Sequence, residues 1–162
     1  MEKVYCINDF WDSTITQGIS KYNNENYFFE CIFSEEDDNW SNNYYLTLLD
    51  ENIFELSLEN WEYWKNWLKQ SIIPHPVEYA NKRKIDTMEN IFLGINVDSG
   101  KMESTEKYYQ NEILIKQYLK NNKPKYIAKG SFHGKNDIRI FKMANGEDST
   151  EVLWEDIQII NQ

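Results

Sequence analysis

The sequence predicts a single α+β domain over residues 1–162. We expect an antiparallel sheet of about four N-terminal and three C-terminal strands, with about three helices packed on one face. Strand-like segments lie before residue 59 and after residue 125, and helical patterns fill the stretch between them; such segregation is typical of α+β folds. Hydrophobic residues make up 41% of the chain and aromatic residues 15%, which suffices for one sizeable core in 162 residues.

The N-terminal strands are predicted where β-branched and aromatic residues dominate. These segments are residues 3–7, 18–22, 27–33 and 44–49, followed by a short strand at 53–58. Residues 23–26 read Asn-Asn-Glu-Asn, which favours a tight turn because asparagine tolerates positive φ. Residues 18–33 are therefore predicted to form a β-hairpin.

A tryptophan-rich helix is predicted over about residues 59–72, with Ser57 or Asn60 as its N-cap and Pro74 beyond its end. At 100° per residue its apolar side spans about 140° of arc. That side carries Trp61, Trp64, Trp67, Leu68 and Ile72. Three indoles on one face exceed what a surface helix needs, so we expect this face to pack on the sheet.

The rest of the chain is predicted to contain two more helices and three strands. The helices cover about residues 77–92 and 105–121, although the run Glu-Ile-Leu-Ile-Lys at 112–116 fits a strand as well. The strands cover residues 126–133, 137–143 and 151–157, and Asn145-Gly146 is a strong hairpin signal between the last two. Trp154, within the last strand, is predicted to be a core residue.

The negative charge of the chain is concentrated at one end. Residues 1–70 contain 4 basic and 14 acidic side chains, whereas residues 71–162 contain 13 of each, so the net charge of −10 belongs to the first 70 residues. Such a field repels nucleic acid and anionic membranes and attracts cations or basic protein surfaces. The alternative is an acidic surface that serves solubility alone.

Sequence motifs for catalysis or cofactor binding are absent from the chain. It has no glycine-rich phosphate loop, no Cys-x-x-Cys or His-Glu-x-x-His and no Gly-x-Ser-x-Gly, so we expect no catalytic residue, no cofactor and no metal. Cys6 and Cys31 lie in strand-like stretches and are predicted to be buried, reduced thiols. One alternative stays open, in which Asp9 and Asp12 join the acids at 35–38 to bind a divalent cation or act as acid and base.

Two acidic segments that contain tryptophan are the candidate protein-binding site, and one of them, residues 34–43 with Trp40, is predicted to be a loop. The predicted site residues are Glu35, Glu36, Asp37, Asp38, Trp40, Trp11 and Asp12. An exposed indole among carboxylates is a common anchor, because it buries much area while the charges select a basic partner. The alternatives are that each indole covers the core, that residues 35–38 are a solvated loop, and that Asp12 only caps a turn.

Several short motifs resemble a group of small uncharacterised bacterial proteins. The matching segments are Asp9-Phe10-Trp11-Asp12, Gly18, Tyr22, Tyr27-Phe28-Phe29, Tyr45-Leu46-Thr47-Leu48, Trp61 with Trp64, His75-Pro76 and Val152-Leu153-Trp154. The resemblance spans most of the chain, except that this sequence is longer between residues 93 and 123. Because that group is associated with immunity proteins of bacterial toxin systems, the resemblance implies this role; it carries no site residues with it.

These observations favour a non-enzymatic, acidic protein-binding module, most specifically an immunity protein that occludes the basic surface of a toxin domain. The alternatives are a structural or regulatory module of a bacterial assembly and a small carboxylate-dependent enzyme. The first residues lack an apolar stretch long enough for a signal peptide, and no apolar run reaches the length of a membrane span. We therefore expect a cytoplasmic protein.

Overall fold

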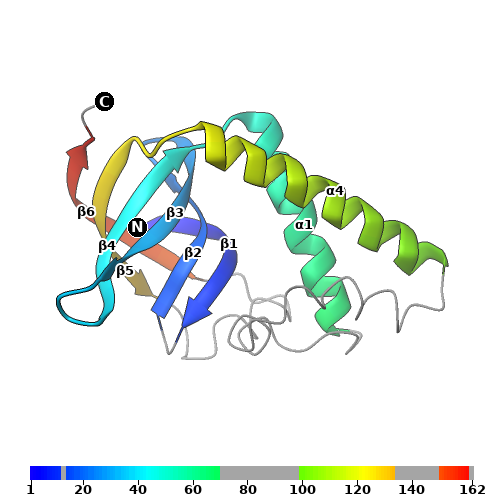
Figure 1. Ribbon diagram of the computed structural model, residues 1–162, viewed down its shortest axis with the longest axis horizontal. Helices are drawn as coiled ribbons and strands as arrows, with labels where there is room; N and C mark the ends of the chain where they lie inside the picture. The colour runs from blue at the N-terminus through cyan, green and yellow to red at the C-terminus, as the bar shows by residue number, and fades with distance from the viewer. Residues whose placement is uncertain (12–13, 70–98, 134–149, 161–162) are drawn as a thin grey trace.

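Six antiparallel strands form a closed barrel in the computed structural model (Figure 1). The structure describes residues 1–11, 14–69, 99–133 and 150–160. For residues 9–11, 67–69 and 99–105 it describes the backbone alone. The described elements are β1 (Glu2–Trp11), β2 (Thr14–Tyr22), β3 (Glu25–Ser34), β4 (Asn39–Leu48), α1 (Glu51–Lys69), α4 (Ser99–Asn121), β5 (Tyr126–His133) and β6 (Glu151–Ile159). Each strand pairs with the next along the chain, and β6 returns to pair with β1.

The predicted open sheet with three helices on one face is therefore wrong. Closure onto β1 turns the sheet into a barrel, which removes most of the exposed strand edge that an open sheet would leave. In the described part of the chain there are two helices, and strands predominate. The predicted helix at 77–92, the strand at 137–143 and the Asn145-Gly146 turn lie outside the described residues.

A turn joins β2 to β3 within the predicted segment 23–26, but it is only two residues long, because β3 begins at Glu25. Asn23 and Asn24 have φ angles of 52° and 63°, and Tyr22 pairs with Glu25 on either side of them. Positive φ at both central positions matches the twist of the flanking strands. The predicted hairpin over residues 18–33 is confirmed.

Four aromatic rings fill the middle of the barrel: Phe29, Tyr44, Phe132 and Trp154. Every pair among them has its ring centroids between 5.3 and 6.0 Å apart. Gly130 makes room for them, since a Cβ at this position would lie 2.6 Å from Trp154 Cζ3. The burial of Trp154 confirms its prediction as a core residue.

The barrel closes through few backbone pairs and one long-range side-chain bond. Glu2 pairs with Val152 and Lys3 with Glu151, and Val4 N donates to the carbonyl of Thr150 at 3.1 Å. Inside the barrel, Trp154 Nε1 on β6 donates to Ser20 Oγ on β2 at 3.0 Å. This bond links β6 to β2 across the seam, because β1 lies between these two strands.

Helix α1 begins earlier than predicted because Asp50 caps it. The Asp50 carboxylate accepts a hydrogen bond of 2.8 Å from Ile53 N, which satisfies one of the free amides of the first turn. The predicted strand at 53–58 is therefore wrong, since those residues continue as helix.

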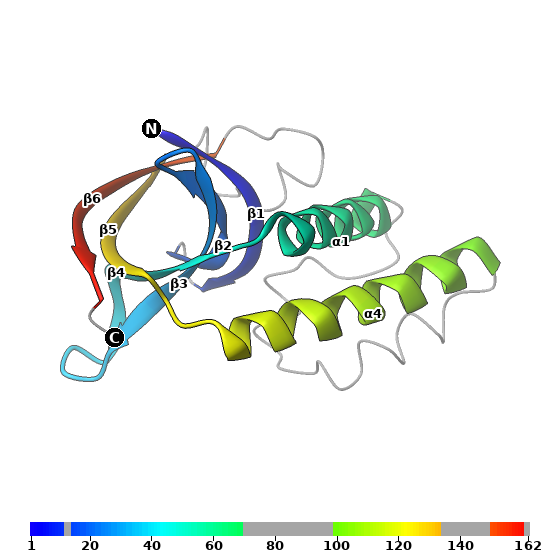
Figure 2. The ribbon, with the colours of Figure 1, turned by 90° about the horizontal axis from the view of Figure 1, so that it is seen from above.

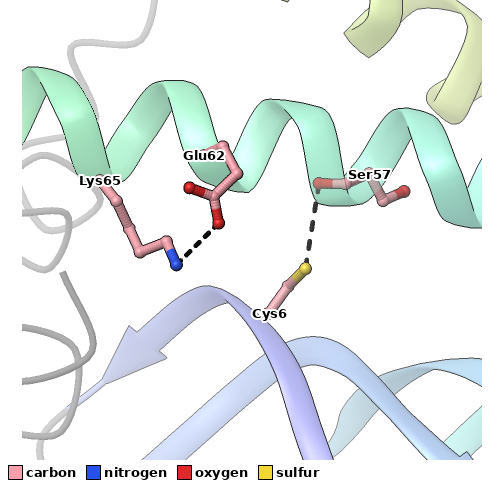
Figure 3. Close-up of polar contacts among 4 residues, drawn as sticks. All are labelled: Cys6, Ser57, Glu62 and Lys65. Atoms are coloured by element: carbon pink, nitrogen blue, oxygen red, sulfur yellow. Dashed lines mark hydrogen bonds and ion pairs between the residues drawn. The ribbon is translucent and has the colours of Figure 1, made fainter. Parts of the chain in front are cut away.

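Helix α1 lies beside β1, where Cys6 Sγ approaches the Ser57 carbonyl at 3.9 Å (Figure 3). Within α1, Lys65 forms an ion pair with Glu62 at 2.8 Å. Cys6 and Cys31 are both buried, as predicted.

Helix α4 packs against α1, and both helices lie on one side of the barrel (Figure 2). The predicted helix at 105–121 is confirmed and starts earlier, at Ser99. Trp61 is buried, but Trp64 faces α4 and donates from Nε1 to Tyr108 Oη at 2.6 Å. The predicted tryptophan face is thus divided between two neighbours and does not pack on the sheet as one surface. Of Trp67 only the backbone is described.

Candidate functional site

One end of the barrel brings together most of the predicted binding segments. At this end β1, β3 and β5 finish and β2, β4 and β6 begin, because consecutive strands are antiparallel. We call it the Trp40 end. The turn between β3 and β4 projects here, on the side of the barrel away from the helices (Figures 1 and 2). The last residue of β1, Trp11, pairs with Thr14 at the same end.

Residues 35–38 form a compact turn that we call the acidic turn. Asp38 N donates to the Glu35 carbonyl at 3.3 Å. Ser34 Oγ accepts from Asp37 N at 3.2 Å and lies 3.3 Å from Asp37 Oδ2, to which it donates. All four acidic side chains are exposed. The predicted carboxylate cluster therefore stands in solvent on a turn held by its own hydrogen bonds.

The base of the acidic turn carries an aromatic pair. Phe33 and Trp40 are direct partners across β3 and β4, with ring centroids 5.2 Å apart and planes at 84°. Phe33 is 42% exposed, whereas Trp40 is half-buried and packs against the core. The prediction of Trp40 as a loop residue is wrong, because β4 begins one residue before it. Trp40 is nevertheless partly exposed, and it follows the acidic turn by two residues.

A hollow of about 450 Å³ opens beside Trp40. Three aromatic residues and three polar ones line most of it: Trp40, Tyr44, Phe132, Thr14, Ser41 and Asn42. They come from β2, β4 and β5, so the hollow exists only because the barrel brings these strands together. Gly130 also lines the wall, and its lack of a side chain lets the rings of Tyr44 and Trp154 pack against the backbone there. A concave surface of mixed aromatic and polar character is the usual form of a binding subsite.

The floor of the hollow is uncharged. Burial raises the pKa of the Tyr44 phenol and of the neighbouring Cys31 thiol, so both stay protonated at neutral pH. Tyr44 donates to the Ile15 carbonyl at 2.7 Å, and Cys31 Sγ lies 3.1 Å from the Ser41 carbonyl. Neither of these groups carries a charge. Along the sequence, the charged side chains nearest to Trp40 are the carboxylates of the acidic turn.

The predicted site residues thus fall into two groups. The first group is the acidic turn, whose four side chains are exposed, together with the half-exposed Trp40 that closely follows it. The backbone of Trp11 reaches the Trp40 end, but its side chain and all of Asp12 lie outside the described residues. Sequence reasoning missed Phe33, Thr14 and Phe132. Phe33 could have been found, because a hairpin centred on residues 35–38 places it opposite Trp40.

Within the described part of the chain, no group of three or more His, Cys, Asp and Glu side chains is arranged to hold a metal ion. None of the described helices is long and apolar enough to cross a membrane. Comparison of the chain with family models, curated proteins and solved structures finds no match.

Proposed function

We propose that this protein is a binding module that docks its acidic turn against a basic surface of another protein. The observation that carries the proposal is the arrangement at the base of the turn. Four exposed carboxylates stand at the tip of a hairpin, and a partly exposed aromatic pair, Phe33 and Trp40, stands directly below them. Charges at the rim and an aromatic residue at the centre are the two parts of a typical protein-binding anchor.

The two parts serve different stages of binding. Exposed carboxylates act over about 8 Å at physiological ionic strength, so they accelerate the encounter with a basic partner and make it sensitive to salt. The aromatic pair acts only on contact, because burial of ring surface slows dissociation. A hairpin fixed by the Ser34–Asp37 bonds keeps both parts in place before binding, which reduces the entropy lost on docking.

The class of partner comes from the resemblance of the sequence. Immunity proteins of bacterial toxin systems neutralise a toxin by covering it, and a nuclease-type toxin presents a cationic cleft that an acidic surface can occupy. We therefore propose a cytoplasmic immunity protein whose acidic turn occludes the basic surface of its toxin. On this proposal the chain needs no catalytic residue and no cofactor.

The test uses the product of the gene adjacent to the gene for this chain. Association is measured by stopped-flow at two salt concentrations, for the wild type and for E35Q/E36Q/D37N/D38N. We expect this variant to associate about tenfold more slowly at low salt and to lose most of its salt dependence. Trp40→Ala should leave association unchanged and accelerate dissociation by about 30-fold, as loss of a central anchor does.

Two matched controls separate the site from general effects. E25Q/E55Q/E106Q/E155Q removes the same charge from exposed positions elsewhere, so it should change association much less. Leu153→Ala truncates an exposed apolar side chain on β6 and should leave dissociation unchanged. Equal slowing by both charge variants would mean that only the total charge matters, and unchanged rates in every variant would contradict docking through the acidic turn.

A further inference from the structure

The hollow at the Trp40 end has a property that the acidic turn lacks, because it is concave and lined by rings. Trp40 and Phe132 are partly exposed and contribute aromatic surface to it next to the buried ring of Tyr44, and Thr14 and Asn42 contribute polar side chains. Asn42 is exposed, so its amide oxygen is accessible to a ligand. Aromatic surface with a few oxygen acceptors suits a cation with an apolar or planar body better than it suits an anion.

The charged residues nearest to Trp40 along the chain belong to the acidic turn. The acidic turn ends at Asp38, two residues before Trp40, so their Cα atoms lie within about 7 Å of each other. Tyr44 and Cys31 below the hollow are held neutral by burial. A positive group that enters the hollow beside Trp40 therefore meets the partly exposed rings of Trp40 and Phe132 and lies close to the acidic turn.

We infer that the hollow lined by Trp40, Tyr44 and Phe132 receives one arginine side chain of the protein that docks on the acidic turn. This inference rests on the proposed function, which it refines by naming the partner group that is recognised. Arginine fits better than lysine, because a planar guanidinium stacks on aromatic faces and is less strongly hydrated than an ammonium group. Its N–H groups reach outward, where the oxygens of Thr14 and Asn42 can accept hydrogen bonds.

The hollow also explains why the half-buried Trp40 serves as an anchor. One part of the indole contacts Phe33 in an edge-to-face pair, and the ring also forms part of the wall of the hollow. Insertion of an arginine would bury more of this ring. The dissociation rate of the partner then depends on the same residue that binds the arginine.

The experiment is an NMR titration of the full ¹⁵N-labelled chain with N-acetyl-arginine amide. We expect saturable shifts at the backbone amides of Thr14, Asn42 and Gly130 and at the Trp40 indole N–H. N-acetyl-citrulline amide, which has nearly the same shape but no charge, should bind at least tenfold more weakly. N-acetyl-lysine amide should bind more weakly than arginine. Equal affinity for citrulline, or shifts that do not saturate, would overturn the inference.

Variants locate the binding. Trp40→Leu should abolish the saturable shifts, and the spectrum of this variant reports whether its fold is intact. Asn42→Ala changes only an exposed side chain and should weaken arginine binding about threefold without disturbing the fold. Leu153→Ala should bind arginine as the wild type does. Wild-type affinity in both Trp40→Leu and Asn42→Ala would place the arginine elsewhere and overturn the inference.

The outcomes distinguish this inference from the proposed function. Suppose that arginine does not bind but neutralisation of the acidic turn still slows association with the partner; the inference then fails and the proposed function stands. In the converse case arginine saturates the hollow while the partner associates and dissociates at the same rates with every variant. That result refutes docking through the acidic turn, and with it the assignment of the arginine to a docking partner.

Discussion

Phe33 on β3 and Trp40 on β4 form the second-to-last cross-strand pair before the acidic turn, and their contact holds the two strands together. Their ring centroids are 5.2 Å apart and their planes stand at 84°, an edge-to-face geometry. Beyond them the chain carries four consecutive acidic residues, whose mutual repulsion opposes the tight turn. The aromatic pair therefore has a structural task besides the binding role that we propose for it, because it keeps the hairpin closed beneath its charged tip.

A double-mutant cycle measures this task. Phe33→Ala and Trp40→Ala each remove one ring, and the double variant removes both. We expect an interaction free energy of about 0.5–1.5 kcal/mol from urea unfolding, since edge-to-face pairs contribute this much beyond their buried area. An additive cycle, with coupling under about 0.3 kcal/mol, would show that the two rings stabilise the hairpin independently.

The backbone of Asp38 offers a second test of the turn. Its φ is 49°, in the left-handed region that glycine adopts without strain. Asp38→Gly should therefore stabilise the protein by about 0.5–1 kcal/mol in urea unfolding, even though glycine adds freedom to the unfolded chain. Asp38→Asn removes the charge but keeps a side chain that tolerates positive φ, so it isolates the electrostatic part. If both variants are equally stable, charge relief and not backbone strain accounts for the gain.

A buried pair of asparagines joins the two helices. Asn111 Nδ2 donates to Asn60 Oδ1 at 2.9 Å and to Glu59 Oε1 at 2.8 Å, and Asn60 Nδ2 donates to the Tyr108 carbonyl at 3.2 Å. Asn111→Leu should cost about 1–3 kcal/mol, because it leaves a buried acceptor without its donor. Asn60→Leu/Asn111→Leu should cost less than the sum of the single variants. A purely additive result would mean that the two amides do not act as a pair.

The sequence located individual elements where their signals are local. The strand predicted at 126–133 has the observed bounds of β5, and the asparagine turn at 23–24 is in place. The error at 53–58 also has a local cause. The apolar residues there fit both a strand and a helix, and the choice depends on the bond from Ile53 N to the Asp50 carboxylate.

Closure of the barrel could not be predicted, because it depends on residues from opposite ends of the chain. Glu2 pairs with Val152 and Lys3 with Glu151, and nothing in either segment specifies the other. The same limit applies to the candidate site. The acidic turn and Trp40 are visible as a run of residues, whereas the hollow requires β2, β4 and β5 to be in register at one end of the barrel.

Tyr44 should make the stability of the protein fall at alkaline pH. Its phenol is buried and donates to the Ile15 carbonyl at 2.7 Å. Burial is the main cause that raises its pKa above the ordinary value of 10.0. The unfolded chain therefore releases this proton from about pH 10 upward while the folded chain retains it. It follows that the stability contributed by the protonated phenol is complete below pH 10 and is lost as the pH rises further.

Tyr44→Phe tests this relationship by urea unfolding from pH 7 to pH 11. At pH 7–9 the variant should be less stable than the wild type by about 1–2 kcal/mol, because the Ile15 carbonyl loses its donor. Above pH 10 the difference should shrink by about 1.4 kcal/mol per pH unit, since only the wild type still has this phenol to titrate in its unfolded state. Burial also raises the pKa of Tyr27 and Tyr108, so both proteins lose stability in this range, and the diagnostic quantity is the difference between them. A difference that stays constant from pH 7 to pH 11 would show that Tyr44 ionises equally in both states and is reached by solvent in the folded barrel.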